Sequence, residues 1–425
     1  MPAGPIDAAG NQDEIARFCA HFDHTAPMWN EHFHEVGAYM RQKCPVLHSD
    51  RHGGFWVVTR YDDVTAVATD TNAFLNSGGV QFPAGDHGGG DTRLMRPSEL
   101  DPPEHRGYRQ LLNPYFTKAR LDVLAPDFRA TADALIDEFA AKSRCDAALE
   151  FAVPFPAECF IDHLLNVPRT ELPRVHDIVD RLLLETDPVQ VRRAADDLAQ
   201  WSKQLLSRRR QEPHPGDVVD ALMNGTVDQR DLSEDEQVDV MIPLLIGGLD
   251  TTASVIGTGI RLLAENSELQ QLVRADRSLL PNLVEEFLRL GAPATLVRTA
   301  ARDVELRGQV IRRGSKVLVP FPIANRDPSQ FEDPDTLHID REINRHVTFG
   351  IGPHRCLGSH VARLSIRVAF EALLDRLDDI QLTPGRPPRF QTVQLRSVRS
   401  LPIQFRVRPG QLTPDRRRDH HRRQA

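Results

Sequence analysis

The sequence is short of the residues that disulfide frameworks, membrane spans and nucleic-acid surfaces require. Its five cysteines are scattered and form no C-x-x-C pair, which is typical of a reducing compartment. The longest apolar run, residues 241–249, is too short to cross a bilayer. Residues 1–14 are polar and contain no signal-like apolar run. Aromatic residues make up only 6% of the chain and the net charge is −8, so binding to polyanions is not favoured. These absences predict a soluble, cytoplasmic protein with no membrane span and no nucleic-acid partner.

What the chain does have is helical periodicity over most of its 425 residues. Apolar spacing predicts helices within residues 14–40, 61–69, 102–141, 154–211, 233–290 and 357–370. Shorter strands are predicted at 46–48, 55–59, 296–304, 310–311, 316–319, 380–382 and 393–407. Residues 78–100 are rich in glycine and are predicted to form a long irregular loop. The sequence therefore predicts a fold that is mainly α with minor β sheets, in a single domain over residues 1–410 followed by a basic, disordered tail at 411–425.

One cysteine, Cys356, stands in a glycine-rich loop directly before the predicted helix 357–370. Loop N–H groups and the positive end of a helix both lower the pKa of a thiol. Gly350, Gly352 and Gly358 have no Cβ, so backbone or a flat macrocycle can approach the sulfur closely. These features suit an ionised cysteine bound to a soft metal, but a buried structural cysteine fits the same residues. The loop alone does not decide between the two.

A second candidate site lies inside the predicted helix 233–265, where Gly247 and Gly248 precede Asp250 and Thr251. Each glycine costs about 1 kcal/mol relative to alanine in a helix, and a threonine hydroxyl can bond to the carbonyl four residues earlier. We therefore expect the helix to be kinked here. The kink would admit a small ligand and place a hydroxyl beside a carboxylate, a pair that can pass protons to a bound oxygen species. The alternative is a glycine pair that lets helices pack closely, with Asp250 in solvent.

Two further patterns are less specific by themselves. Glu286 and Arg289 are spaced i, i+3 on one helix face and would form an ordinary surface ion pair. His105 and Arg109 are spaced i, i+4, and two cations one turn apart repel each other unless they share an anion. That anion could be the carboxylates of a buried cofactor. A solvated basic face explains the same two residues.

Along the chain the four motifs follow in the order His105/Arg109, 247–252, Glu286/Arg289 and the cysteine loop. Together and in that order they resemble the motifs of the cytochrome P450 monooxygenases, which are haem-thiolate enzymes. The resemblance spans residues 22–407. The cysteine loop is its most specific part and matches at Phe349, Gly350, Gly352, His354, Arg355, Cys356 and Gly358. The resemblance implies a triangular, helix-rich prism with haem between the long central helix and the cysteine-bearing helix. The chain is most similar to the bacterial, camphor-hydroxylase-like branch, which implies a compact, hydrophobic, terpenoid-like substrate.

The resemblance also implies roles for individual residues. Cys356 would be the axial ligand of the iron in haem b and would favour O–O cleavage. The other cofactor-binding residues would be His105, Arg109, Arg298 and His354, which would pair with the propionates, and Phe349, Gly350 and Gly358. Asp250 and Thr251 would deliver protons to bound O2. Glu286 and Arg289 would form a structural pair with a further partner in residues 325–345, and would matter for haem incorporation.

The substrate pocket of this family is lined by the irregular loop, the long helix, the segment after the Glu-x-x-Arg motif and the last β turn. The implied lining residues here are Gln81, Phe82, Arg93, Leu244, Leu245, Gly247, Gly248, Ala294, Thr295, Leu296, Val297, Gln394 and Leu395. Most of them are apolar, which implies a hydrophobic small-molecule substrate. Arg93 is the exception, since it could meet a substrate carboxylate or could be a solvated loop arginine.

Basic residues gather in the sequence on the cysteine side of the implied fold, at Arg106, Arg109, Lys118, Arg120, Arg345, Arg355, Arg363 and Arg367. On an acidic protein they predict a docking face for a small acidic electron donor. A ferredoxin fits, reduced from NAD(P)H by a ferredoxin reductase. We expect a monomeric monooxygenase that inserts one atom of O2 by hydroxylation or epoxidation. Two alternatives remain: a peroxide-using peroxygenase, which would not need Asp250 and Thr251, and a non-catalytic haem-binding sensor, which would not need the basic face.

Overall fold

The structure, a computed structural model, describes residues 8–81, 93–185, 187–212, 215–392 and 395–409. Its helices are α1 (Ala8–Ala20), α2 (Pro27–Glu31), α3 (Phe33–Lys43), α4 (Tyr61–Thr69), α5 (Glu104–Leu112), α6 (Lys118–Asp122), α7 (Ala125–Ala140), α8 (Pro154–Glu158), α9 (Leu172–Leu184), α10 (Pro188–Arg209), α11 (Val218–Asn224), α12 (Glu234–Leu249), α13 (Thr251–Ala264), α14 (Ser267–Ala275), α15 (Leu280–Leu290), α16 (Phe321–Ala324) and α17 (Ser359–Arg376). Its strands are β1 (Val46–Ser49), β2 (Phe55–Val58), β3 (Phe74–Leu75), β4 (Arg144–Asp146), β5 (Thr226–Val227), β6 (Arg230–Asp231), β7 (Thr295–Ala300), β8 (Val304–Leu306), β9 (Gln309–Ile311), β10 (Lys316–Pro320), β11 (Leu377–Leu382), β12 (Arg389–Thr392), β13 (Arg396–Ser400) and β14 (Pro402–Val407). The predicted tail at 411–425 lies outside the described residues.

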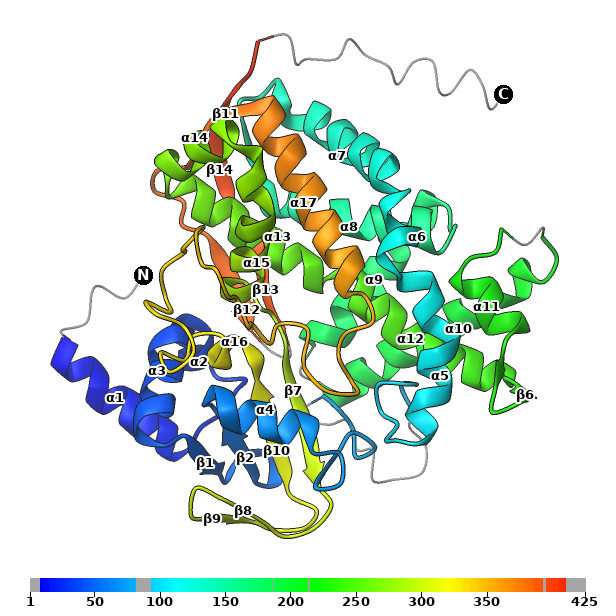
Figure 1. Ribbon diagram of the computed structural model, residues 1–425, viewed down its shortest axis with the longest axis vertical. Coiled ribbons are helices and arrows are strands. Elements are labelled where there is room, and N and C mark those ends of the chain that lie inside the picture. Colours follow the sequence, from blue (N-terminus) through cyan, green and yellow to red (C-terminus); the bar gives the residue numbers. More distant parts are fainter. Residues whose placement is uncertain (1–7, 82–92, 186, 213–214, 393–394, 410–425) are drawn as a thin grey trace.

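The largest sheet joins strands from residues 46–75 to strands from residues 295–320. Its strand order is β1-β2-β10-β7-β3, and β10 runs parallel to β2 but antiparallel to β7. Helices α1 to α4 gather around this sheet at one corner of the molecule (Figure 1). The start of β7 reaches toward the molecule's centre, where Ala294 forms an isolated bridge with Leu395 beside the β12–β13 hairpin. The sheet thereby fixes β7 as one wall of the central site.

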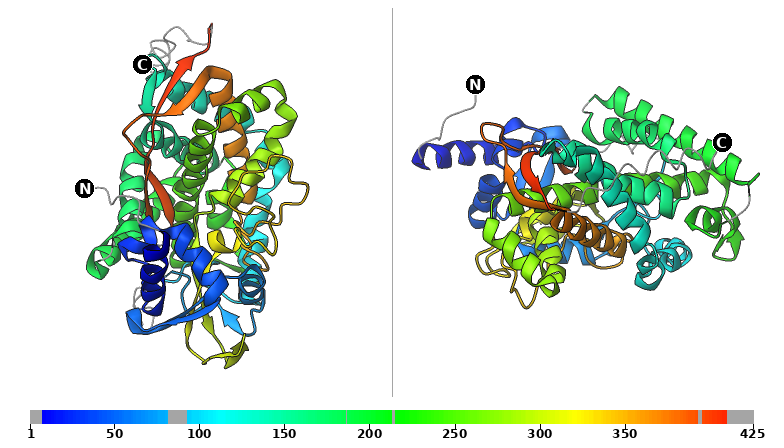
Figure 2. Two further views of the ribbon diagram at one scale, coloured as in Figure 1. Left: turned by 90° about the vertical axis from the view of Figure 1, so that its left-hand side faces the viewer. Right: turned by 90° about the horizontal axis from the view of Figure 1, so that it is seen from above.

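The helical part surrounds α12 and α13, which follow each other through the middle of the molecule. The α9–α10 pair packs on α12, while α17 packs on both α7 and α13. Figure 1 shows α17 lying beside α7, and Figure 2 shows that the body, triangular in outline, is thinner when turned by 90°. The predicted fold class, mainly helical with small sheets, is confirmed.

The predicted long helix begins as expected and is interrupted at one residue. Ser233 Oγ accepts from the Glu236 N–H and the Glu236 carboxylate accepts from the Ser233 N–H, which forms a capping box at the start of α12. Asp250 (φ −109°, ψ −28°) separates α12 from α13, and the Thr251 hydroxyl donates to the Gly247 carbonyl at 2.8 Å. The expected kink is therefore present.

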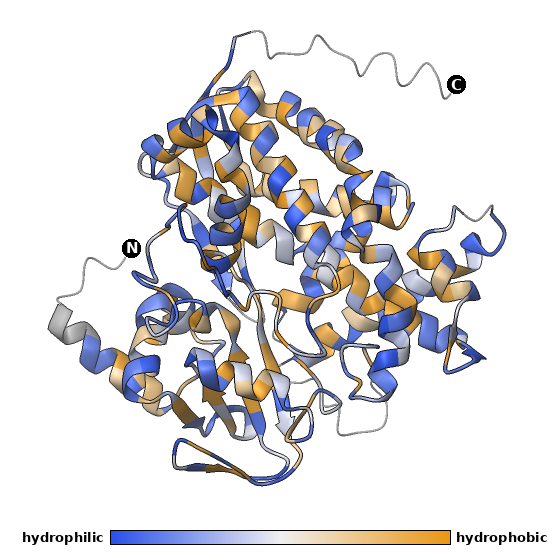
Figure 3. Ribbon diagram, viewed as in Figure 1, coloured by the Kyte–Doolittle hydropathy of each residue, from blue (hydrophilic) through white to orange (hydrophobic). Residues whose placement is uncertain are grey.

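Outer helices such as α7 show both hydrophobic and hydrophilic residues, as one-sided burial requires (Figure 3). Helices α12 and α13 differ because they are surrounded by protein. Together, Glu234–Ala264 are long and apolar enough to cross a membrane, but 72% of their most apolar window is buried inside the protein, and core helices pass the same test.

Candidate active site

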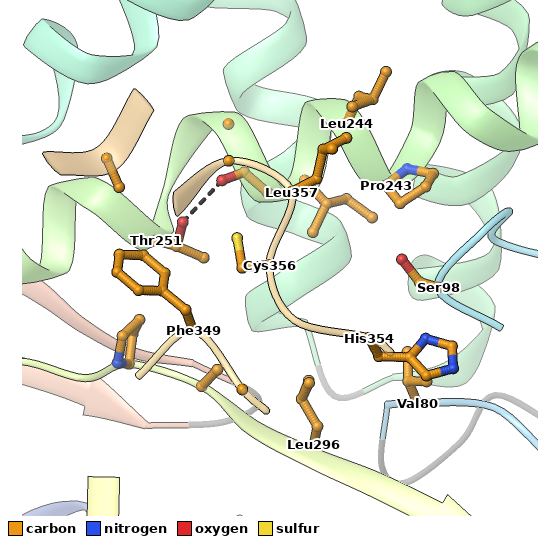
Figure 4. A pocket seen from close by; sticks show the side chains of 18 of the residues that line it. Val80, Ser98, Pro243, Leu244, Thr251, Leu296, Phe349, His354, Cys356 and Leu357 are labelled. Carbon is orange, nitrogen blue, oxygen red and sulfur yellow. Dashed lines mark hydrogen bonds between the residues drawn. The ribbon is translucent and has the colours of Figure 1, made fainter. Parts of the chain in front are cut away.

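A cavity of about 330 Å³ lies where α12, α13, α5, β7 and the cysteine loop meet. Thr251 lines it from the helix side, and Cys356 and Phe349 line it from the loop. Figure 4 shows the loop of Cys356 passing the helix that carries Thr251, with His354 and Leu296 at the other end of the loop. The chain thus brings the predicted acid–alcohol segment and the predicted iron ligand to one chamber.

The cysteine loop is held by its backbone. The Cys356 N–H donates to the Phe349 carbonyl at 2.7 Å. Gly350 (φ 65°) and Gly352 (φ 78°) lie in the left-handed region that favours glycine, and a Cβ on Gly352 would lie 3.3 Å from the Ala68 carbonyl oxygen. A Cβ on Gly358 would stand 3.9 Å from the Cys356 Sγ. The loop sequence therefore fixes where the sulfur projects.

The Cys356 side chain is exposed, but into the cavity, and protein surrounds that cavity. Burial raises the pKa of the thiol, against the Gly358 N–H and the positive charges of Arg109 and Arg355, which act to lower it. The sequence predicts a lowered pKa, and this expectation is wrong for the thiol without a metal. Desolvation is the largest effect on the pKa of the thiol. In addition, α17 begins at Ser359 and not at residue 357, so the positive end of the helix is farther from Cys356 along the chain than expected. A bound metal cation would ionise the sulfur directly.

Four cationic or cationisable side chains line the same cavity: His105, Arg109, Arg298 and His354. The rings of His105 and His354 lie 4.2 Å apart, and Arg109 Nη1 donates to the Arg355 carbonyl at 2.8 Å. Arg298 is only 3% exposed and donates to the Val297 carbonyl at 2.8 Å. Within the described ranges, no ion pair joins any of the four to a carboxylate.

The electrostatics of this cluster suit a bound anion. Burial lowers the pKa of Arg298 to about 10. Burial, followed by the charges of His105 and Arg298, lowers the pKa of His354 to about 3. The Nε2 atom of His354 is buried and has no hydrogen-bond partner. An anion between these groups would satisfy them, because buried cations are normally paired.

These residues fit haem b. Cys356 offers a thiolate to the iron, the loop glycines leave room beside the sulfur, and the cationic cluster offers donors to two propionates. Phe349, Gly350 and Gly358 also line the cavity, as the resemblance implies.

Asp250 does not line the cavity with Thr251. Its side chain is buried and accepts a hydrogen bond from Ser397 Oγ on β13 at 2.7 Å. Arg399 Nη2 lies 4.0 Å from the carboxylate, and Arg399 Nη1 lies 3.4 Å from Asp180 on α9. Burial raises the pKa of Asp250, opposed by the charge of Arg399 and the bond from Ser397. Neither sequence-based alternative placed Asp250 in this buried corner.

The two glycines have different surroundings. A Cβ on Gly248 would lie 2.4 Å from Cδ1 of Phe160, so Gly248 allows close packing. A Cβ on Gly247 would meet nothing within 4 Å, because Gly247 faces the cavity. Gly248 therefore serves helix packing, and Gly247 leaves space in the cavity.

The implied pocket residues divide into three groups. Those that line the cavity are Gln81, Leu244, Gly247, Gly248, Ala294, Leu296 and Leu395. Phe82 and Gln394 lie outside the described residues. Leu245, Thr295 and Val297 do not line the cavity, which corrects the sequence-based assignment. Leu245 is on another face of α12, and along β7 successive side chains alternate, so Leu296 and Arg298 face the cavity while Thr295 and Val297 do not.

Arg93 is also corrected. It neither lines the cavity nor is fully solvated, because it forms ion pairs with Asp235 at 2.6 Å and Asp239 at 2.9 Å on α12. Its side chain is 33% exposed.

Several lining residues were missed by sequence reasoning: Val80, Pro97, Ser98, Pro156, Phe160, Leu183, Val240 and Pro243. Phe160 belongs to a π-helical segment, Cys159–Leu164, and Leu183 to α9. Apolar residues on helices carry no local signal that separates a cavity wall from the core.

Glu286 and Arg289 form a buried pair instead of a surface pair. Both side chains are essentially unexposed, and the guanidinium binds the carboxylate through two hydrogen bonds of 2.7 and 2.8 Å. Arg341, within the predicted 325–345 stretch, lies 3.2 Å from the same carboxylate. Burial acts to raise the pKa of Glu286, but the bonds and charge of Arg289 hold it below its usual value.

Comparisons with known proteins agree with this site. The cytochrome P450 family model matches residues 155–405. The vitamin D3 dihydroxylase of Streptomyces griseolus is 35% identical over 339 residues, which cover 77% of this chain and 81% of that protein. The mycinamicin IV hydroxylase/epoxidase of Micromonospora griseorubida is 36% identical over 344 residues, covering 77% and 83%. The crystal structure of CYP108D1 from Novosphingobium aromaticivorans matches with a TM-score of 0.83 and 29% identity, covering 93% of this chain and 98% of that one. The chain therefore belongs to the cytochrome P450 family and is a monooxygenase of the bacterial type.

Proposed function

We propose that this P450 hydroxylates or epoxidises a hydrophobic natural-product molecule, of terpenoid type or similar size, with electrons from a ferredoxin. The observation that carries the proposal is the cavity itself. Its helix and strand walls are largely apolar, with Leu244, Ala294, Leu296 and Leu395 among them, and Thr251 offers a hydroxyl close to the cysteine loop. The two named relatives act on vitamin D3 and mycinamicin IV, which supports a hydrophobic, multi-ring or macrocyclic substrate class.

Haem b, when bound through Cys356, supplies the activation of O2 for insertion into a C–H or C=C bond. The protein residues hold and orient it. His105, Arg109, Arg298 and His354 would hold the propionates, which would neutralise the positive charge of the two arginines.

Asp250 and Thr251 handle the protons. Burial raises the pKa of Asp250, which favours its protonated form more than in water. Rotation of the carboxyl away from Ser397 brings a proton to the Thr251 hydroxyl, which lines the cavity and can donate into it. Thr251 already bridges the kink by donating to Gly247, so it can exchange that bond for one to a ligand.

Thr251→Ala tests this role. We expect NAD(P)H consumption to continue while product falls and H2O2 rises, because reduced oxygen leaves before it is protonated productively. Thr251→Ser, which keeps the hydroxyl at the same position, is the matched control and should keep its coupling. Full coupling in Thr251→Ala would show that the hydroxyl has no part in proton delivery.

The electron donor is proposed to dock on the cysteine side. Arg106, Arg345 and Arg355 are exposed there, and no ion pair is found for them in the part of the chain that the structure describes. We expect Arg106→Glu to slow reduction by ferredoxin and to weaken its dependence on salt. Arg144→Glu, at an exposed position on β4, should leave the rate unchanged. Equal rates for both variants would contradict this docking face.

Substrate class and donor can be tested together. A library of terpenoids, steroids and macrolides is screened for shifts of the haem Soret band, and hits are incubated with ferredoxin, reductase and NAD(P)H, or with H2O2 alone. The proposal is supported if product forms with ferredoxin, reductase and NAD(P)H but not with H2O2 alone. Product with H2O2 alone would support a peroxygenase, and binding without product under either condition would support a ligand sensor.

A further inference from the structure

Helix α12 contains a proline in its interior, Pro243, which also lines the cavity. Proline has no N–H, so the carbonyl four residues earlier, on Asp239, receives no hydrogen bond from the helix. A backbone group from outside the helix takes that place. The N–H of Arg96 is shared between two acceptors, the Asp239 carbonyl at 3.1 Å and the Leu94 carbonyl of its own segment at 3.1 Å. The proline therefore creates the acceptor to which the segment around Arg96 is attached.

The side chain of Asp239 binds the same segment. One carboxylate oxygen accepts from Arg93 Nη1 at 2.9 Å and the other from Arg96 Nη1 at 3.0 Å. The Asp239 side chain is only 10% exposed, so these ion pairs are weakly screened by solvent. Burial acts to raise the pKa of Asp239, opposed by the bond from Arg93. Asp239 thus accepts three hydrogen bonds from Arg93 and Arg96, two on its carboxylate and one on its carbonyl.

The attached segment is a wall of the cavity. Met95, Pro97 and Ser98 line it together with Pro243. Figure 4 shows Ser98 and Pro243 on the same side of the cavity, from the loop and from the helix. The segment is closed on itself by Glu99, whose carboxylate accepts from the N–H groups of Met95 at 2.9 Å and Val80 at 3.3 Å. Asp239 is the residue of α12 that binds both arginines of the segment, and Asp235 adds a second, more exposed partner for Arg93.

We propose that Pro243 and Asp239 are positioning residues that determine which ligands the pocket accepts, by holding the segment Met95–Ser98 against α12. The proposal rests on the proposed function, in which this cavity is the substrate pocket. Hydrogen exchange of the Arg96 amide tests the anchor independently of that assignment. Neither residue touches the reacting atoms. Both act through the wall that they hold in place.

The proline and the carboxylate can be removed separately. In Pro243→Ala the new N–H can donate to the Asp239 carbonyl within the helix and so compete with Arg96. In Asp239→Asn the size of the side chain is kept but its charge is lost, which weakens both arginine bonds. Pro281→Ala is the matched control, because Pro281 is exposed in the first turn of α15, where a proline frees no buried carbonyl.

The first readout is hydrogen exchange of the Arg96 amide in the haem-loaded protein, measured by mass spectrometry with fragmentation to single residues. We expect exchange to be about threefold faster in Pro243→Ala, because the amide loses one of its two acceptors and keeps the Leu94 carbonyl. Asp239→Asn should accelerate it as well. Pro281→Ala should not change it.

The second readout is the affinity for two haem ligands of different size, from spectral titration. We expect the dissociation constant of 4-phenylimidazole, which is large enough to touch the wall, to change by about threefold or more in both variants. That of imidazole should stay close to the wild-type value. Unchanged exchange at Arg96 would show that Pro243 does not anchor the segment. If the Arg96 amide exchanges faster but the two dissociation constants change equally, or neither changes, the anchor does not set ligand preference.

Discussion

Replacing Arg289 by methionine should destabilise the protein far more than its spacing in the sequence suggests. The guanidinium is fully buried and forms two hydrogen bonds with Glu286. It also donates to three backbone carbonyls, those of Asn325 at 3.2 Å, Pro334 at 2.5 Å and Thr336 at 2.8 Å. Removing one partner of a buried ion pair costs about 3–5 kcal/mol. Arg341 and Asn344 still contact the Glu286 carboxylate, which favours the lower end of this range, while the three carbonyls that lose their donor favour the upper end.

We therefore expect a loss of about 3–5 kcal/mol, a large part of the ~5–15 kcal/mol that stabilises a typical domain. Urea unfolding followed by tryptophan fluorescence measures it, because Trp29 and Trp201 are both 1% exposed and report on two regions of the core. The fraction of purified protein that carries haem is the second measurement, and it should fall as well.

Two variants make the result specific. Arg261→Met removes a partly exposed i, i+4 pair with Glu265 and should cost only about 0–0.5 kcal/mol. Arg289→Lys keeps the charge but not the two-pronged geometry, and should fall between the wild type and Arg289→Met. If Arg289→Met unfolds at the same urea concentration as Arg261→Met, the buried pair does not support the fold as argued.

Three further outcomes follow from the site. Gly248→Ala should lower the free energy of unfolding by about 1–3 kcal/mol, measured in urea, because the added methyl overlaps Phe160. Gly247→Ala should leave stability unchanged or raise it by up to ~1 kcal/mol, yet weaken binding of bulky ligands in spectral titrations, because its methyl enters the cavity. Burial acts to raise the pKa of Glu285, but the bonds from Arg363 and His346 lower it to about 2. Since the folded pKa lies below the usual one, Glu285 contributes at most ~3 kcal/mol above pH ~4.5, lost as the pH falls toward 2, and Glu285→Gln should flatten the acid side of the stability–pH profile.

The elements that depend on local pattern were predictable from the sequence. The capping box at Ser233 marks the start of α12, and the glycine pair at 247–248 predicts the kink that the structure places at Asp250. Pairing between distant segments was not predictable. β10 pairs with β2 although they are far apart in the sequence, and β3 is only two residues long, too short for any alternation to be recognised.

The candidate site likewise contains residues that a local sequence pattern marks and residues that it does not. Cys356 is marked by its glycines, since two of them need a backbone conformation that other residues rarely adopt. Phe160 and Leu183 carry no such mark, because a helix presents the same apolar face to a cavity as to a core. Arg93 was misjudged because its partners, Asp235 and Asp239, lie on a helix that the loop meets only in three dimensions.

The orientation of Asp250 could have been worked out from helix geometry. Consecutive residues of a helix point about 100° apart, so the neighbours Asp250 and Thr251 cannot face the same direction. Leu244, Gly247, Gly248 and Thr251 follow the i, i+3, i+4, i+7 pattern of one face, and this is the face that lines the cavity. Asp250 is off that face and meets Ser397 instead. A proton that reaches Thr251 through Asp250 therefore arrives across the helix, from the side of α9 and β13, and the substrate filling the cavity does not block its path.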